Sequence, residues 1–181
     1  MSHVALFNTE KGKPFITCLE AVRLAAKNLG CDVFERNTYK WYGRHVGDWK
    51  LPPGWRADEL GRKATLVIKP NEETRKKLDI PDDCYELAVI EDKLNPGAYT
   101  IMYDFYAGGR GLDKVIGSPV INLGTQDVQQ LAPKFVQHYR MCADALSAAE
   151  VGDEIQFEEQ SDGSWISYTI PNETRLRESG Y

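Results

Sequence analysis

The chain has 181 residues, of which 42% are hydrophobic, and its 22 Lys and Arg stand against 27 Asp and Glu, for a net charge of -5. A globular chain of this length buries roughly 70% of its unfolded surface, so a core forms without disulfides or metal ions. The composition therefore excludes global disorder. Apolar runs are far shorter than the ~20 residues that cross a bilayer, and no secretion signal opens the sequence. We therefore expect a cytoplasmic protein with no membrane partner.

Apolar periodicity and turn residues predict the elements of the fold. Pro14 suits the first turn of a helix, Gly30 suits a helix end, and Asn95-Pro96-Gly97 and Asp162-Gly163 have the chemistry of tight turns. In the first half of the chain we expect a strand at 4–8, a helix from 13 or 14 to about 29, a strand at 32–42, an irregular loop at 44–63 and a strand at 64–69. A charged segment at 71–83 follows, with a helical turn at 74–78, and then a hairpin of strands at 84–91 and 99–106. A second helix is expected from 126 or 127 to about 149, with Pro133 as its true start or as a kink, and a hairpin of strands at 155–159 and 165–170 comes last.

This order predicts one α+β domain over residues 1–170, followed by a polar tail at 171–181. Two helices cannot cover both faces of a sheet of this size. We therefore expect a mostly antiparallel sheet with two helices packed on one face, as in a ferredoxin-like or related two-layer sandwich. Long loops would cover part of the other face. The similar exits of the two helices, Leu29-Gly30 and Val151-Gly152, are explained equally by an internal repeat and by convergence.

The residues that usually bind metals or perform catalysis form no pattern. The cysteines and histidines are Cys18, Cys31, Cys84, Cys142, His3, His45 and His138. No pair has the short spacing of a zinc site, and Cys18 and Cys142 fall on the apolar faces of the predicted helices. We expect no metal site and no cofactor, and the sequence leaves the catalytic residues, if any, unknown.

The strongest local signal is the aromatic/basic segment, Arg36–Lys63. It carries seven Lys and Arg against three Asp and Glu, a local +4 that leaves -9 on the rest of the chain, and it holds three of the four tryptophans. Rings that stack on bases, interleaved with cations that neutralise phosphates, are typical of nucleotide and single-stranded nucleic-acid binding. The other interpretation is that the tryptophans cover an open part of the core while the basic groups extend outwards.

The binding interpretation assigns a role to seven residues. Three tryptophans would stack or anchor the ligand, three basic residues of the segment would supply charge, and one arginine outside it would complete the surface. These residues are Trp41, Trp49, Trp55, Arg44, Lys50, Arg56 and Arg110. The loop at 44–63 is read as an insertion that carries most of them.

Two further stretches have a functional and a plain structural interpretation. Gly108-Gly109-Arg110-Gly111 would bring backbone N–H groups and a guanidinium to an anion, but it lacks the spacing of a phosphate-binding loop, and a flexible turn is the simpler use. Acidic residues flank the last hairpin and would suit a basic partner or a divalent ion. Alternation of exposed acids along a half-buried strand is the simpler account of them.

Several short motifs resemble a small uncharacterised family found in bacteriophages, cyanobacteria and plastid genomes. They are Met1-Ser2-His3, Leu29-Gly30, Tyr42-Gly43, Tyr103-Asp104-Phe105, Gln137-His138-Tyr139 and Asp162-Gly163-Ser164. The segments at 44–63 and 71–83 depart from that pattern as insertions. The resemblance implies a compact α+β fold, a cytoplasmic setting and a phage origin, and it implies no activity.

The leading hypothesis is a non-enzymatic, phage-associated binding protein. Its aromatic/basic segment would engage a nucleotide, a nucleic acid or a partner protein. One alternative is a metal-dependent or acid-base hydrolase of nucleotides or nucleic acid, using His45 or His138 with Asp104 or Asp113. A second alternative is an adaptor or inhibitor that binds a host protein through a sheet face or an edge strand.

Overall fold

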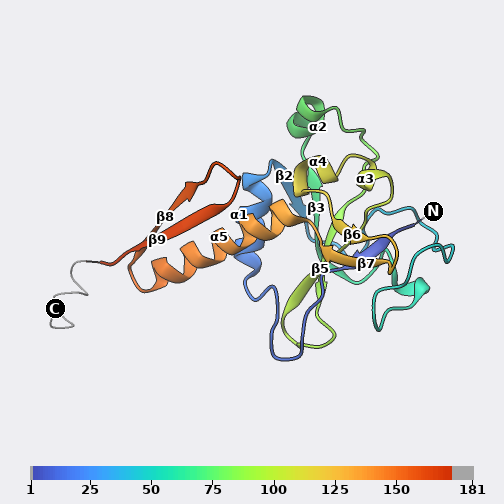
Figure 1. The fold of residues 1–181 in the computed structure, drawn as a ribbon, viewed down its shortest axis with the longest axis horizontal. Coiled ribbons are helices and arrows are strands. Elements are labelled where there is room, and N and C mark those ends of the chain that lie inside the picture. Colours follow the sequence, from blue (N-terminus) through green and yellow to red (C-terminus); the bar gives the residue numbers. More distant parts are fainter. Residues whose placement is uncertain (1, 173–181) are drawn as a thin grey trace.

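The computed structural model describes residues 2–172, and its centre is a five-stranded antiparallel sheet (Figure 1). The strands are β1 (Val4–Leu6), β2 (Cys31–Phe34), β3 (Ala64–Pro70), β4 (Leu87–Glu91) and β5 (Tyr99–Asp104). Their order across the sheet is β1-β5-β4-β3-β2. The pairing of β1 with β5 places Val4 opposite Asp104, so the N-terminal strand becomes one edge of the sheet. The α+β class and the antiparallel sheet are confirmed.

Two long helices cover one face of this sheet. They are α1 (Leu19–Asn28) and α5 (Pro133–Glu150), which pack against each other. Alternate residues of the strands, such as Leu87, Val89 and Ile101, join the buried side chains of both helices in the larger core cluster. Because side chains alternate across a strand, the intervening residues face the opposite side.

The second face of the sheet is covered by the aromatic/basic segment. Tyr39, Trp55 and Leu60 are buried there against Val67 and Ile90, with Trp41 and Leu51 partly buried beside them. The segment contains a single 3₁₀ turn, η1 (Ala57–Glu59). Trp55 and Trp41 therefore cover the sheet face that the helices leave open, as in the second interpretation of the segment. The molecule has three layers, which are the helices, the sheet and this loop.

Three regions differ from the predicted elements. The helix expected from 13 or 14 begins at Leu19, since Ile16 before it exchanges backbone hydrogen bonds with Tyr99. The strand expected at 32–42 ends at Phe34. Beyond it the Asn37 carbonyl still accepts from the Ala64 N–H at the start of β3, but the next bond, from the Tyr39 N–H, goes to the Gly61 carbonyl outside that strand. The helix expected from 126 or 127 begins instead at Pro133, after Ala132 in a left-handed conformation with φ of 46°. Residues before it form a separate hairpin, β6 (Val120–Asn122) and β7 (Asp127–Gln130).

Short helices complete the body. The turn expected at 74–78 is confirmed as part of α2 (Glu72–Leu78), which the Asn71 side chain caps by accepting the Thr74 N–H at 2.8 Å. Two four-residue elements, α3 (Ala107–Arg110) and α4 (Asp113–Ile116), follow β5 and lie beside the sheet. No helix within residues 2–172 is long and apolar enough to span a bilayer.

The last hairpin, β8 (Glu154–Glu159) and β9 (Trp165–Ile170), is confirmed and stands apart from the five-stranded sheet. It packs on the C-terminal half of α5, and the two project together from the body (Figure 1). The turn of the hairpin lies toward the body, whereas β9 ends at the far tip. Most of the polar tail expected at 171–181 lies outside the described residues.

Candidate functional site

The structure does not gather the seven predicted site residues on one surface. Trp49 and Trp55 are only 8% and 7% exposed, so their rings cannot stack on a ligand in this conformation. Trp49 packs edge-on against Phe105, with ring centroids 5.2 Å apart, while Trp55 lies under the Lys93 ammonium, 4.1 Å from its ring. Both rings belong to the core: Trp55 covers the sheet face that has no helix over it, whereas Trp49 belongs to the larger core cluster, which also contains the buried residues of α1 and α5.

The basic residues of the segment also separate. Arg56 forms an exposed ion pair with Asp58, and the Lys50 ammonium donates to the Thr125 carbonyl at 2.6 Å. Two pairs of the seven predicted residues share a pocket. Trp49 and Lys50 line a hollow of about 210 Å³ beside β1, and Trp41 and Arg110 line a larger one. Arg44 is exposed on the loop and lines neither of them.

The larger of these two pockets has a volume of about 400 Å³. It lies where the aromatic/basic segment meets the start of β4 and the turn after β5. Its walls are aromatic, with two cations and one carboxylate among them, and they are formed by Lys40, Trp41, Tyr42, Asp83, Tyr85, Tyr106, Ala107 and Arg110. We call it the tyrosine pocket. Its size falls within the range of small-molecule sites in proteins.

One wall is a left-handed turn of five consecutive residues. The φ angles from Ala107 to Gly111 are 51°, 64°, 59°, 54° and 97°. For alanine and arginine this conformation costs about 1–2 kcal/mol each, and runs of such residues are rare. The turn is held in place by the Tyr85 N–H, which donates to the Gly109 carbonyl at 3.0 Å. Strain of this kind is typical of functional sites, where the surrounding fold maintains it.

A buried carboxylate ties the pocket together. Asp104 is 0% exposed, and its Oδ1 accepts the backbone N–H groups of His3 at 2.9 Å and Tyr106 at 3.0 Å. Its Oδ2 accepts the Tyr42 N–H at 3.1 Å. Asp104 thus joins the N-terminus, the aromatic/basic segment and the left-handed turn. The sequence reading gave Asp104 an acid-base role, but all three contacts assign it a positioning role.

A second buried acid, Glu86, holds the part of the wall that begins at Lys40. The Glu86 carboxylate accepts the Lys40 N–H and a guanidinium N–H of Arg36, both at 2.7 Å, and the Glu86 N–H donates back to the Lys40 carbonyl at 3.0 Å. Glu86 and Asp104 therefore hold both ends of the stretch from Lys40 to Tyr42. The pocket walls are preorganised by groups that do not themselves line it.

The charge of the tyrosine pocket opposes that of the whole chain. Lys40 and Arg110 stand against Asp83, which pairs with Arg110 at 2.6 Å, so the lining is net +1 on a chain of -5. Both partners of this pair are nearly half exposed. Burial raises the pKa of Tyr85, so its hydroxyl is neutral at physiological pH.

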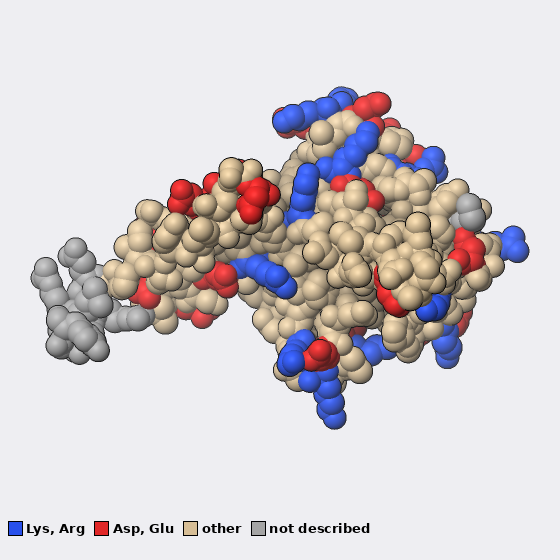
Figure 2. Space-filling view, in the orientation of Figure 1, with Lys and Arg blue, Asp and Glu red and all other residues tan. Residues whose placement is uncertain are grey.

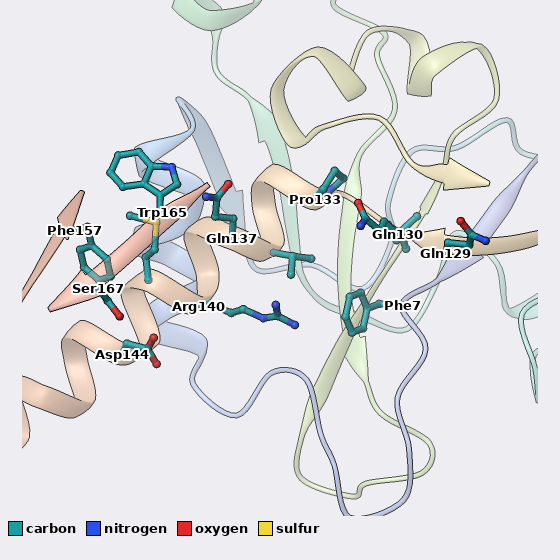
Figure 3. Close-up of a pocket in the computed structure, with 13 residues that line it drawn as sticks. Phe7, Gln129, Gln130, Pro133, Gln137, Arg140, Asp144, Phe157, Trp165 and Ser167 are labelled. Atoms are coloured by element: carbon teal, nitrogen blue, oxygen red, sulfur yellow. The ribbon is translucent and has the colours of Figure 1, made fainter. Parts of the chain in front are cut away.

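A larger hollow, of about 490 Å³, lies along α5 and is shown in Figure 3. We call it the α5 groove. Arg140 extends through its middle, toward Phe7, and Asp144 lies one helical turn further on. Trp165 and Ser167 of β9 form one side, and Gln129 and Gln130 of β7 form the other end. Its charges balance, unlike those of the tyrosine pocket.

The groups proposed for a hydrolase are dispersed. His45 lies on the aromatic/basic segment and His138 on α5, where burial lowers the pKa of its imidazole. Asp113 accepts a hydrogen bond from the Tyr103 hydroxyl at 3.0 Å. Within residues 2–172, no group of three His, Cys, Asp or Glu side chains is arranged to hold a metal ion.

Asp113 makes the stability of the fold depend on pH. Burial raises its pKa to about 6, the main cause, while the Tyr103 hydroxyl partly opposes the shift. Because the folded pKa lies above the unfolded value of about 3.9, this site favours the folded state below pH 4, and the benefit is lost as the pH rises through 6. After a discount for partial exposure we expect a loss of about 1–2 kcal/mol in the free energy of unfolding.

Asp113→Asn tests this pH dependence, because asparagine keeps an acceptor for Tyr103 but has no charge. In urea unfolding, the free energy of unfolding of the variant should match that of the wild type at pH 4 and exceed it at pH 7. An equal gain from the exposed Asp127→Asn at pH 7 would contradict this.

Trp41 is positioned by a glycine. A Cβ on Gly61, whose φ is 75°, would lie 2.2 Å from the Trp41 Nε1, whereas Gly54, with φ of 77°, has nothing within 4 Å. Both substitutions to alanine strain the backbone by about 1 kcal/mol. We expect Gly61→Ala to cost about 1–2 kcal/mol more than Gly54→Ala because Trp41 must move. Urea unfolding and near-ultraviolet circular dichroism measure both effects, and equal results for the two variants would contradict the contact.

Comparisons with protein-family models, with curated proteins and with solved structures found no match. The resemblance to a phage, cyanobacterial and plastid family stays a prediction. The sequence signal that pointed toward the tyrosine pocket was the glycine-rich stretch at 108–111. Tyr85 and Tyr106 carried no motif, and Tyr42 belonged only to the short Tyr42-Gly43 motif, since the three come from segments that only the fold brings together.

Proposed function

We propose that this protein is a binding protein whose tyrosine pocket takes a nucleotide. The observation that carries the proposal is the combination, in one preorganised pocket, of aromatic walls with an excess of positive charge on an acidic chain. A nucleotide offers a ring for the aromatic groups and a phosphate for the cations. A long nucleic acid is less well supported, because the basic residues of the segment form no continuous track.

The phosphate would lie between Lys40 and Arg110. Arg110 is engaged by Asp83, but an exposed ion pair of this kind contributes about 0–1 kcal/mol, so a dianionic phosphate displaces it at little cost. The Lys40 ammonium makes no ion pair within residues 2–172 and is available to the ligand. The base would then contact the rings of Tyr42 and Tyr106, which already lie edge to face with centroids 6.1 Å apart.

Calorimetric titration tests this proposal. Nucleoside mono-, di- and triphosphates, the parent nucleosides and inorganic phosphate are each titrated into the full chain at 50 and 300 mM salt. We expect binding of nucleotides that weakens with salt, and weaker binding of nucleosides or phosphate alone. Lys40→Gln and Arg110→Gln should each raise the Kd at least tenfold.

Arg44→Gln is the matched control, since it removes an exposed cation of the same segment outside the pocket. An unchanged Kd for Arg44→Gln, with losses for the two pocket variants, supports the proposal. Equal losses for all three variants indicate attraction by general charge, which contradicts it, as does the absence of nucleotide binding at millimolar concentration. A cytoplasmic location and a phage origin stay predictions from the sequence.

A further inference from the structure

Within residues 2–172, the free edge of β9 carries none of the charges, prolines or bulges that commonly protect edge strands. Within the described residues β9 pairs with β8 alone, so its other edge is open. Its six residues, Trp165–Ile170, include no charge, no proline and no glycine. Edge strands of monomeric proteins usually have charged residues, proline or a bulge, which prevent another strand from pairing. An open, uncharged strand of this length is suited to accept one.

The outward face of β9 is also apolar. Ile166, Tyr168 and Ile170 are 44%, 47% and 41% exposed, and they alternate along the strand. On β8 the residues opposite them are Glu158, Gln156 and Glu154. Figure 2 shows acidic side chains gathered over this hairpin. The two edges of the hairpin therefore differ, since the β8 edge is acidic and the β9 edge is neutral and apolar.

Hydrogen bonding in the hairpin defines which groups face the open edge. Next to the turn, the Gln160 N–H donates to the Ser164 carbonyl at 2.7 Å. In an antiparallel pair, bonded and non-bonded residues alternate. Trp165, Ser167 and Thr169 therefore direct their N–H and C=O groups away from β8, toward the open edge.

We propose that a second copy of this chain pairs with β9 through the same strand, antiparallel and centred on Ser167. Trp165 of each copy would lie opposite Thr169 of the other, and the three edge residues of each strand would use all their outward N–H and C=O groups. The result is a four-stranded sheet with the two β9 strands in the middle. Ile166 would face the partner's Tyr168 on the outer side, a pairing that stabilises sheets.

Three observations favour a second copy over pairing through β8 or with an unrelated strand. Self-pairing through β8 would place its glutamates against their equivalents, whereas β9 pairing leaves the acids on the two outer edges. The two bodies would lie at opposite ends of the new sheet, because the hairpin turn lies toward the body and an antiparallel partner points the other way (Figure 1). Both α5 helices would lie on one face of the new sheet, with the Trp165 side of the α5 groove at the seam.

Sedimentation velocity of the full chain from about 1 to 200 µM tests the association. We expect a reversible dimer whose formation persists at 0.5 M salt, since backbone bonds and apolar pairs hold it. The double variant Ile166→Lys/Tyr168→Lys places lysines opposite lysines at the seam and should raise the dimer Kd at least tenfold. Glu154→Lys/Gln156→Lys adds lysines on the outer strand and should leave the dimer intact. A wild type that stays monomeric, or equal effects of the two doubles, would overturn the proposal.

A cysteine at the centre of symmetry tests the register. Ser167→Cys would face the partner's Cys in a bonded pair, where Cα atoms are about 5.5 Å apart, within reach of a disulfide. Mild oxidation should therefore cross-link this variant as a dimer, and Ser161→Cys, in the hairpin turn, should not cross-link. Equal cross-linking of both variants, or of neither, contradicts the pairing at Ser167. These outcomes are independent of nucleotide binding, because the tyrosine pocket shares no residue with β9.

Discussion

Replacing Trp55 with alanine is expected to destabilise the fold by about 3–5 kcal/mol. Trp55 is buried in the smaller core cluster, on the sheet face that no helix covers. Its removal leaves a cavity next to Val67 and Ile90, and it also removes the ring under the Lys93 ammonium. The free energy of unfolding from urea titration measures the loss.

Trp165→Ala is the matched control, because it removes the same ring from the half-buried hairpin. We expect a loss of at most about half that of Trp55→Ala, since a half-buried ring forfeits less apolar contact. A mild effect of Trp55→Ala, coupled with loss of nucleotide binding, would instead restore the stacking role that the sequence suggested for this tryptophan.

Replacing Asp104 with alanine is expected to cost a similar amount, about 3–5 kcal/mol, and to abolish binding in the tyrosine pocket. The substitution leaves the N–H groups of His3, Tyr42 and Tyr106 without their acceptor. Each buried donor without a partner costs about 1–3 kcal/mol, and partial access of water reduces the sum. Urea unfolding and nucleotide titration are the measurements.

Asp104→Asn separates the three bonds. With its carbonyl in the place of Oδ1, asparagine still accepts from His3 and Tyr106, but its amide group meets the Tyr42 N–H donor to donor. We expect a loss of about 1–3 kcal/mol that detaches the aromatic/basic segment while the left-handed turn stays in place. The exposed Asp127→Ala should change the free energy of unfolding by less than about 0.5 kcal/mol. If Asp104→Ala is equally mild, Asp104 is not the anchor described above.

Periodicity predicted the elements that bury one regular apolar face. The buried strand at 64–69 and the two hairpins at 84–106 and 155–170 appear with small shifts at their ends, and the first helix ends near Leu29 as expected but begins at Leu19. The stretch before Pro133 was assigned to the second helix because Val128 and Leu131 continue the helical spacing of the true helix. Pro133 was the one sequence signal for its start, whereas the left-handed conformation of Ala132 has no signal in the residue type.

The site was harder to predict than the fold. A tryptophan beside lysine and arginine is compatible with stacking on a ligand and with covering a sheet, and burial decides between the two. The sequence predicted the two long helices and long loops over the other face of the sheet, but not the short helices α3 and α4. Trp41 and Arg110 were both named, yet they come from distant segments. The acids that position their neighbours carry no motif, since Asp104 ends β5 and Glu86 directly precedes β4.

The position of β1 has a consequence for the dynamics of the pocket. Three residues pair with β5 across a separation of about a hundred residues, at the edge of the sheet, so this is the most distant pairing in sequence among the strands of the five-stranded sheet. Short edge strands with such distant partners are the first elements to open and the last to form. Amide exchange at β1 and at the His3 N–H should therefore be faster than in β4. Each opening event withdraws one of the three donors from Asp104, so access to the pocket is coupled to fraying of the N-terminal strand while the central sheet remains folded.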